Sequence, residues 1–276
     1  MTNNPKIIRG AGGPPPPSAP PQPTRTPDTL HSRQFATLLD LISEGEIEGF
    51  ATASKAGLTK GTTAYNNAAL KDVFLNNTAI LQSSASNTSP VSTDFNFQDV
   101  SFTPRFGTSN QEHISGIESS QSINAVGVTV TNSSPVTRTI SNSDIDAVKV
   151  TVTFPQIQVA TDAGDLLGSS VNLQIQIQYN GGGFTTLIDD TVTGRTADAY
   201  QKEYRVNLTG SFPVDVKVVR VTADATSAST VNTFQFTSFT EIIDDKQTYL
   251  NSAYTSLRLD SQQFSSIPSR KYRIRG

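Results

Sequence analysis

The clearest pattern in the chain is an alternation of apolar and polar residues that begins near Ala125 and recurs as far as Phe236. A period of two is typical of antiparallel strands with one buried face and one solvent-exposed face. The strands that it predicts lie within residues 126–130, 148–152, 171–177, 184–188, 214–221 and 233–237. The segment Asn180-Gly181-Gly182-Gly183 predicts a hairpin turn. Many short strands without helical stretches between them favour a β-sandwich.

Shorter strands are predicted on either side of this region. They are expected within residues 46–50, 73–75, 78–81, 254–260 and 270–276. The pair Asn76-Asn77 predicts the turn of a hairpin between the second and third of these segments. The apolar side chains of Phe95, Phe97, Val100 and Phe102 indicate one more strand, which we expect to end near Pro104.

One amphipathic helix is predicted from about Ser32 to Glu44. Its apolar positions recur at spacings of three and four residues, at Phe35, Leu38, Leu39 and Ile42, with Asp40 and Glu44 on the opposite side. Ser32 or Asp28 is the expected N-terminal cap, and Gly45 is a natural stop. Because a helix of about 12 residues is marginal alone, we expect this apolar stripe to pack against a sheet.

Residues 1–29 are predicted to form an extended arm. Eight of the 15 prolines fall between Pro14 and Pro27, directly after Gly10-Ala11-Gly12-Gly13. Proline fixes φ and lacks a backbone donor, so the stretch favours polyproline II, and residues 14–27 would extend for roughly 40 Å. Two interpretations stay open, a disordered tail or an arm that reaches a neighbouring subunit and becomes ordered on assembly.

Composition narrows the possible classes of protein. Charged residues make up 16% and apolar residues 35% of the chain, which fits neither an acidic disordered tail nor a membrane protein. The net charge of −3 argues against a nucleic-acid binder. The absence of Cys excludes disulfides, thiolate metal sites and a Cys nucleophile. Since neither an export signal nor a long apolar segment is found, we expect a cytosol-like compartment or release by cell lysis.

No catalytic, metal-binding or cofactor-binding site is predicted. Asp189-Asp190 and Asp244-Asp245 are adjacent carboxylates, and neighbouring residues of a strand point to opposite faces, so neither pair forms an acid/base dyad. His113 beside Glu112 lacks the spacing of metal ligands. Gly10-Ala11-Gly12-Gly13 has no strand before it and no helix after it, so a phosphate-binding loop is not expected.

The basic residues near the C-terminus are the clearest charged cluster. Arg270, Lys271, Arg273 and Arg275 would lie on both faces of a strand, which favours an acidic protein partner over nucleic acid. Together with the arm, this cluster supplies the candidate partner-binding residues. They are Arg9, Pro14, Pro17, Arg25, Asp28, Leu30, Arg270 and Arg273.

A resemblance to a known family covers most of the chain. The segment Gly10-Ala11-Gly12-Gly13, a Pro-rich stretch and residues 27–32 lead into residues 39–49. This order resembles the start of the tip attachment protein J family, the host-specificity or central tail-hub proteins of lambda-like long-tailed phages. The likeness recurs in residues 135–141, 171–180, 240–247 and 259–265.

The resemblance implies a structural hub of the virion tail tip and no enzyme. Such a hub is a homotrimer that joins the distal tail tube to the host-attachment tip and gates the genome exit channel. Its implied partners are neighbouring tail-tip and distal tail proteins, with the tape-measure protein and genomic DNA passing through its lumen. A low charge density suits such a passage because it limits contacts with phosphates. Assembly is expected in the host cytoplasm, and the host receptor would contact only regions downstream of this chain.

The expected fold is mainly β. It is a hub-type β-barrel with one short packed helix and an inserted antiparallel β-sandwich, preceded by the Pro-rich arm. The expected division is 1–29 for the arm, 30–110 for the first part of the hub domain, 111–238 for the inserted sandwich and 239–276 for the return to the hub domain. Family members continue well beyond this length, so we expect the chain to be the front of a longer protein. Its arm has Pro where relatives are often Gly-rich, which would stiffen it.

Two alternatives belong to other functional classes. One is a carbohydrate-binding β-sandwich module of a phage tail, used in host recognition through exposed aromatic residues. The chain has no Trp, the best stacking residue, which weakens this alternative. The other is a tail-associated hydrolase, for which the sequence offers no catalytic group.

Overall fold

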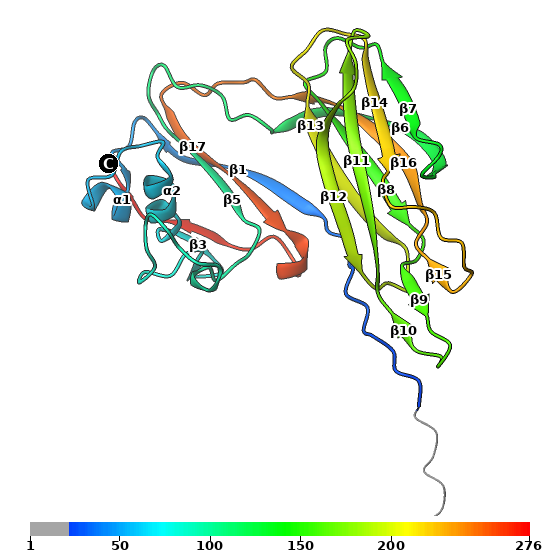
Figure 1. The fold of residues 1–276 in the computed structure, drawn as a ribbon. Coiled ribbons are helices and arrows are strands. Elements are labelled where there is room, and N and C mark those ends of the chain that lie inside the picture. The colour runs from blue at the N-terminus through cyan, green and yellow to red at the C-terminus, as the bar shows by residue number, and fades with distance from the viewer. Residues whose placement is uncertain (1–21) are drawn as a thin grey trace, which may run out of the picture.

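The computed structural model describes residues 22–276, which fold into two bodies built mainly from β-strands (Figure 1). The larger body is a sandwich of two antiparallel sheets with four strands each. The smaller body combines short open sheets with two helices and carries the C-terminus (Figure 1). The expectation of a mainly β protein is confirmed, and the two large sheets agree with the predicted sandwich.

The sandwich has one sheet in the order β12-β11-β14-β7 and another in the order β13-β8-β16-β6. The strands are β6 (Glu118–Val130), β7 (Val136–Ile140), β8 (Ala147–Phe154), β11 (Ser169–Tyr179), β12 (Thr185–Gly194), β13 (Tyr200–Asn207), β14 (Val214–Arg220) and β16 (Phe234–Asp244). All six predicted sandwich strands fall within these elements, apart from single residues at their ends. A short sheet of β9 (Gln158–Ala160), β10 (Leu166–Leu167) and β15 (Thr230–Val231) continues the sandwich near the arm (Figure 1).

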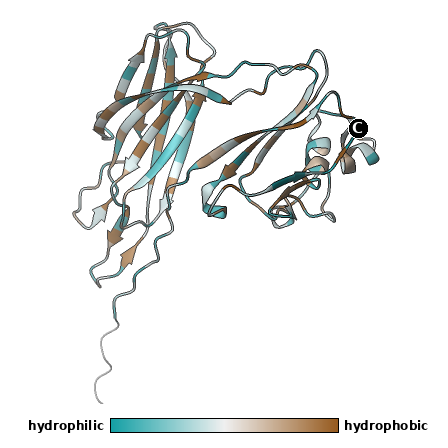
Figure 2. Ribbon diagram, turned by 180° about the vertical axis from the view of Figure 1, so that it is seen from behind, coloured by the Kyte–Doolittle hydropathy of each residue, from teal (hydrophilic) through white to brown (hydrophobic). Residues whose placement is uncertain are grey.

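The core of the sandwich explains the period of two. Val148, Val150 and Val152 of β8 are fully buried, and so are Leu173 and Ile175 of β11. The residues between them point away from the core, and Figure 2 shows apolar and polar positions alternating along the sandwich strands. One buried face therefore sets the pattern that the sequence displays.

The smaller body contains a three-stranded sheet in the order β1-β17-β5, a second sheet in the order β18-β3-β4 and the pair β19-β2. Its strands are β1 (Phe35–Glu44), β2 (Gly49–Phe50), β3 (Val73–Leu75), β4 (Thr78–Ala79), β5 (Ser101–Phe106), β17 (Ser252–Asp260), β18 (Arg270–Tyr272) and β19 (Ile274–Arg275). Its helices are α1 (Ala51–Lys55) and α2 (Thr63–Leu70), and 3₁₀ turns occupy Ser92–Asp94 and Ser261–Gln263. The predicted hairpin is confirmed, with Asn76 and Asn77 at φ of 48° and 67° between β3 and β4.

The predicted helix at residues 32–44 is wrong, because residues 35–44 form strand β1. Leu39 pairs with Ser256 of β17, which lies far along the chain, and Leu39 and Leu41 remain exposed. A short helix is only marginally stable by itself, whereas the strand conformation lets residues 35–44 pair with β17 over a long antiparallel ladder. The strand conformation is therefore the more stable one here. Asp28 and Ser32 cap nothing: Asp28 pairs with Arg195, and Ser32 Oγ accepts the Gln201 N–H at 2.9 Å.

Other local expectations also need correction. Helix α2 was not predicted, although Thr62 caps it by accepting the Tyr65 N–H at 3.2 Å. Strand β5 does not end near Pro104 but runs through it to Phe106, because β5 is an edge strand whose outer N–H needs no partner. Phe95 and Phe97 precede this strand, and Phe97 stacks on Phe264 instead.

The hub-type barrel is not found, since the sheets formed by residues 22–276 are all open. The expected boundary at residue 238 falls inside β16, which continues in the sandwich sheet to Asp244. Two connections, residues 107–117 and 245–251, join the bodies and are tied together by Gln111, whose amide donates to the Tyr249 carbonyl at 2.6 Å and the Ser252 carbonyl at 2.8 Å. A third crossing, residues 31–34, leads from the arm to β1.

Candidate interaction sites

The described end of the arm lies along the sandwich as an added strand. Arg25 forms a parallel bridge with Leu166 of β10, the Thr26 N–H donates to the Leu166 carbonyl, and the Leu166 N–H donates to the Thr24 carbonyl, both at 2.9 Å. The Thr24 N–H and hydroxyl donate to the Asp165 carboxylate, and these bonds lower the pKa of Asp165. The arm thus extends an existing sheet edge in the manner of β-strand addition.

Arg195 fixes the segment that follows. Its side chain is 1% exposed, forms an ion pair with Asp28 and donates to the Thr26 carbonyl at 3.0 Å. Its carbonyl accepts the N–H groups of Thr29 and Leu30 at 2.9 and 3.3 Å. Leu30 then packs against the sandwich core. The arm is therefore held by hydrogen bonds and an ion pair around the buried Arg195 guanidinium and by the apolar contact of Leu30.

Gly194 makes room for this contact. A Cβ at this position would lie 2.6 Å from the Thr29 hydroxyl and 2.9 Å from Leu30 Cγ, and its φ of 152° is one that other residues rarely adopt. We call the set Thr26, Asp28, Thr29, Leu30, Gly194 and Arg195 the arm clip. Of the predicted partner-binding residues, Asp28 and Leu30 belong to the arm clip and Arg25 lies beside it, whereas Arg9, Pro14 and Pro17 lie outside the described residues.

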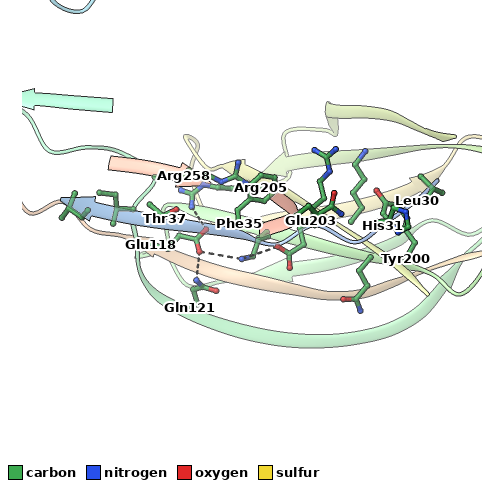
Figure 3. A pocket seen from close by; sticks show the side chains of 18 of the residues that line it. Leu30, His31, Phe35, Thr37, Glu118, Gln121, Tyr200, Glu203, Arg205 and Arg258 are labelled. Atoms are coloured by element: carbon green, nitrogen blue, oxygen red, sulfur yellow. Dashed lines mark hydrogen bonds and ion pairs between the residues drawn. The ribbon is translucent and has the colours of Figure 1, made fainter. Parts of the chain in front are cut away.

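A groove of about 1010 Å³ separates the two bodies (Figure 3). Strand β1 supplies Phe35, Thr37 and Leu39 to it. The sandwich supplies polar and charged side chains from β6, β8 and β13, among which Figure 3 labels Glu118, Gln121, Tyr200, Glu203 and Arg205. One wall is therefore partly apolar and the opposite wall is charged.

Most charges in the groove neutralise one another. Lys149 lies 3.8 Å from Glu118 and 3.7 Å from Glu203, and Lys202 lies 2.6 Å from Asp190. Arg33 pairs with Asp99 and lies 3.5 Å from Asp260. Among the lining Arg and Lys residues, only Arg258 has no carboxylate at ion-pair distance within residues 22–276. Its guanidinium lies 3.5 Å from the centre of the Phe35 ring, and burial lowers its pKa.

Arg205 bridges the two strand ends at which connections 107–117 and 245–251 meet the sandwich. Its guanidinium donates to Glu118 at 3.0 Å and to Asp244 at 2.6 Å. Glu118 is the first residue of β6 and Asp244 is the last residue of β16, so one side chain holds the points where the chain enters and leaves the sandwich. This connection stabilises the position of the two linkers.

The C-terminal basic residues all have partners within the chain. Arg270 donates to both oxygens of Asp40, at 2.5 and 2.8 Å, and Arg273 pairs with the fully buried Asp72 at 2.6 Å. Lys271 donates to the Asn77 side chain, and Arg275 pairs with Glu48 at 3.2 Å. The carboxylates that these residues contact therefore belong to the chain itself, and they attach the C-terminal strands to the smaller body.

The adjacent carboxylates are engaged in separate networks. Asp189 accepts from Asn172 and Gln174, which lower its pKa. Burial raises the pKa of Asp190, but hydrogen bonds from Lys202 and Tyr204 outweigh this effect, and the net shift of the pKa is downward.

Residues 22–276 contain no group of three His, Cys, Asp or Glu side chains that could hold a metal ion. The longest helix in this part of the chain has eight residues, and none could cross a lipid bilayer.

The comparisons with known proteins agree with this architecture. Residues 120–245, which span nearly the whole sandwich, match the family model of the FNIII-A domain of tip attachment protein J. The larger body is thus similar to the FNIII-A domain of that family. The resemblance to the tip attachment protein J family is confirmed over most of the chain, and the chain is related to that family.

Two curated relatives carry this resemblance. A tip attachment protein J of Escherichia phage SECphi4 is 31% identical over 256 residues, which is 92% of this chain and 20% of the relative. A tip attachment protein J of Escherichia phage SECphi27 is 25% identical over 72% of this chain and 16% of the relative. The chain therefore spans a fifth or less of the length of these relatives. Their names describe attachment proteins and not enzymes.

Similar solved structures resemble the chain only weakly. A GH115 4-O-methyl-α-glucuronidase has a TM-score of 0.26 and 11% identity, covering 48% of this chain and 18% of the enzyme. A structure of infectious bursal disease virus, Gt strain, has a TM-score of 0.23 and 12% identity, covering 90% of this chain and 62% of the viral protein. Likeness at this level carries no functional argument.

Proposed function

We propose that the chain is a structural part of a phage tail tip, located in the virion. The observation that carries this proposal is its similarity, along 92% of its length, to a protein named for tip attachment. Within the tip, the chain would act as a hub that joins the distal tail tube to the host-attachment apparatus and gates the genome exit channel.

The contacts between the two bodies support a mechanical role. Three crossings of the chain join the bodies, Gln111 ties two of them together, and Arg205 holds their sandwich ends. The C-terminal strands are attached to the smaller body by Arg270 and Arg273 through Asp40 and Asp72. A part that transmits load between neighbours needs such cross-links between distant segments more than it needs a catalytic cavity.

The hub would be a homotrimer. Closed cyclic symmetry is usual for soluble assemblies, and permanent interfaces bury about 2,000–5,000 Å². Neighbouring tail-tip and distal tail proteins would contact the hub, and the tape-measure protein and DNA would pass through its lumen. The low charge density of the chain suits this passage, since few Lys and Arg residues are available for phosphates.

Immunolabelling of virions tests the location. Antibodies raised against the sandwich should label particles at the tail tip when viewed by negative-stain electron microscopy. Antibodies against a capsid protein are the control, and they should label heads only. Label from the sandwich antibody on heads or along the tail tube would overturn the proposal.

A second candidate function rests on the outer face of the β12-β11-β14-β7 sheet. Asn172, Gln174, Gln176 and Gln178 form a row there and hydrogen-bond to Asp189, Thr186 and Asp215. Phe184 is exposed beside the row, with Lys217 Nζ 3.7 Å from its ring centre. Aligned amides and an aromatic ring are groups that bind sugars. Binding on a glycan array that Phe184→Ala abolishes would support this carbohydrate-binding role, and an array without binding would remove it.

A further inference from the structure

The edges of the sheets differ in how well they are protected against pairing with another chain. An exposed edge strand offers free backbone donors and acceptors, and natural proteins usually block it with Lys, Pro or other charged residues. The two sandwich sheets and the β1-β17-β5 sheet have six edge strands: β1, β5, β6, β7, β12 and β13. Four of these carry blocking residues.

The blocking residues are clear in each of the four cases. Strand β5 contains Pro104 and Arg105, and β7 contains Arg138 at its centre. Strand β12 contains the Asp189-Asp190 pair, and β13 contains Lys202, Glu203 and Arg205. These edges are therefore poor templates for an added strand.

Strands β1 and β6 lack such protection. Strand β1 pairs only with β17, and β6 pairs only with β16, so each has one free edge in the part of the chain that the structure describes. Strand β1 has a single internal charge, Asp40, against two adjacent charges in β12 and three in β13. The charge of β6 is Glu118 at its first residue. Both strands contain β-bulges, after Leu41 in β1 and after Ala125 in β6, and the uninterrupted parts of the two edges are residues 35–41 and 120–125.

The same two strands carry the most exposed apolar side chains. Ile123 of β6 is 72% exposed and Leu41 of β1 is 65% exposed, more than any other large apolar residue that the structure describes. Burying such a side chain contributes about 1.5–3 kcal/mol. An open edge and an uncovered apolar residue thus coincide twice in one chain.

We infer that β1 of one copy pairs with β6 of the next copy, and that these contacts close a ring. A second copy is the occupant that the structure favours, because each chain supplies both an open β1 edge and an open β6 edge. Pairing of β1 with β1 would make a two-fold dimer and leave Ile123 uncovered. Head-to-tail pairing covers both residues in every copy and closes when the rotation between copies permits it. The inference rests on the proposed function only for the number of copies, which is three.

The chain has no Cys, so engineered thiols map this contact without background. The full 276-residue chain would be made as Leu41→Cys and as Ile123→Cys and treated with a short bis-maleimide. A mixture of the two variants should give a cross-linked dimer, and neither variant alone should do so. The chain that carries both substitutions should give a ladder ending at three times 29.5 kDa. A dimer from Leu41→Cys alone, or no cross-link in the mixture, would overturn the inference.

Ile267 provides a matched control. It is 64% exposed but lies in the loop between the last 3₁₀ turn and β18. Ile267→Cys mixed with Leu41→Cys should give no cross-link.

Sedimentation provides a second measurement. Leu41→Lys or Ile123→Lys should weaken self-association at least about tenfold, since a Lys blocks strand addition. Ile267→Lys should leave self-association unchanged. Unaltered circular dichroism of all three variants verifies the fold, and self-association that neither edge variant weakens would contradict the pairing.

The outcome is separable from that of the proposed function. Label at the tail tip together with a missing cross-link would overturn the pairing and leave the tail-tip role intact. A cross-linked trimer together with label elsewhere on the virion would leave the pairing intact and overturn the role.

Discussion

Arg195 and Asp28 form an ion pair between residues that lie 167 positions apart in the sequence. The guanidinium is buried in the sandwich, and the carboxylate belongs to the arm. This pair, with the backbone bonds of Thr29 and Leu30 to the Arg195 carbonyl, holds this segment of the arm against the sandwich. On the side toward residue 22, the arm stays bonded to the sandwich through Thr24 and Thr26, which pair with Asp165 and Leu166.

Asp28→Ala should release the described end of the arm. The substitution leaves the buried guanidinium without its carboxylate, which we expect to cost about 1–3 kcal/mol because Asp28 is partly exposed. Limited proteolysis between residues 22 and 30 should become faster, and the urea midpoint should fall. Arg25→Ala is the control, since the Arg25 side chain is exposed and makes no ion pair within residues 22–276. Equal cleavage rates for Asp28→Ala and the unaltered chain would show that the pair does not hold the arm.

Asp40→Asn should destabilise the chain in a pH-dependent way. Burial raises the pKa of Asp40, but hydrogen bonds from Arg270 and Tyr272 outweigh this effect and hold the pKa below its ordinary value of 3.8. A depressed pKa contributes stability above about pH 4 that is lost as the pH falls toward the folded-state pKa. We expect a loss of about 1–2 kcal/mol at pH 7, measured by urea unfolding, and a smaller loss at pH 3. A loss that is independent of pH would contradict this account.

Asn76→Ala should weaken the hairpin that joins β3 and β4. Asn76 has φ of 48°, and its side chain accepts the Ser269 N–H at 3.0 Å. Alanine tolerates this φ poorly and cannot accept the bond, so we expect a loss of about 1–2 kcal/mol in thermal or urea unfolding. Asn77→Gly is the matched control, since glycine suits a φ of 67° and only the exposed bond from Lys271 is lost, so the loss should be smaller than that of Asn76→Ala. A larger loss for the glycine variant would refute the turn assignment.

The sandwich could be predicted from the sequence because its signal is local. Alternate residues of β8 and β11 are buried, and the Gly-rich turn before β12 marks a hairpin. The hairpin at Asn76-Asn77 is local in the same sense. Strand β1 differs, because Leu38, Leu39 and Leu41 are compatible with helix or strand and the decision comes from β17, more than two hundred residues later. Non-local pairing overrides weak helix propensity in such a segment.

The arm clip and the groove could not be predicted for a related reason. Arg195 shows no pattern that distinguishes it from other arginines, and its role depends on a fold that brings Asp28 beside it. The basic cluster at the C-terminus was visible in the sequence, but its partners Asp40 and Asp72 were not. For α2 a usable signal did exist, because Thr62 precedes Tyr65, Ala68 and Ala69, all buried on one face.

Arg205→Met should loosen the junction between the two connections and the sandwich. The variant keeps much of the aliphatic stem but loses the bonds to Glu118 and Asp244, which we expect to cost about 1–2 kcal/mol. The two carboxylates then lack the cation that they share, and their repulsion is screened by salt. The lowering of Tm should therefore be larger at about 0.02 M than at about 0.5 M NaCl. Arg138→Met is the control, because within residues 22–276 Arg138 donates only to the carbonyl of neighbouring Thr137. A Tm loss that is equal for both variants, or that grows with salt, would exclude a role for Arg205 in holding these strand ends together.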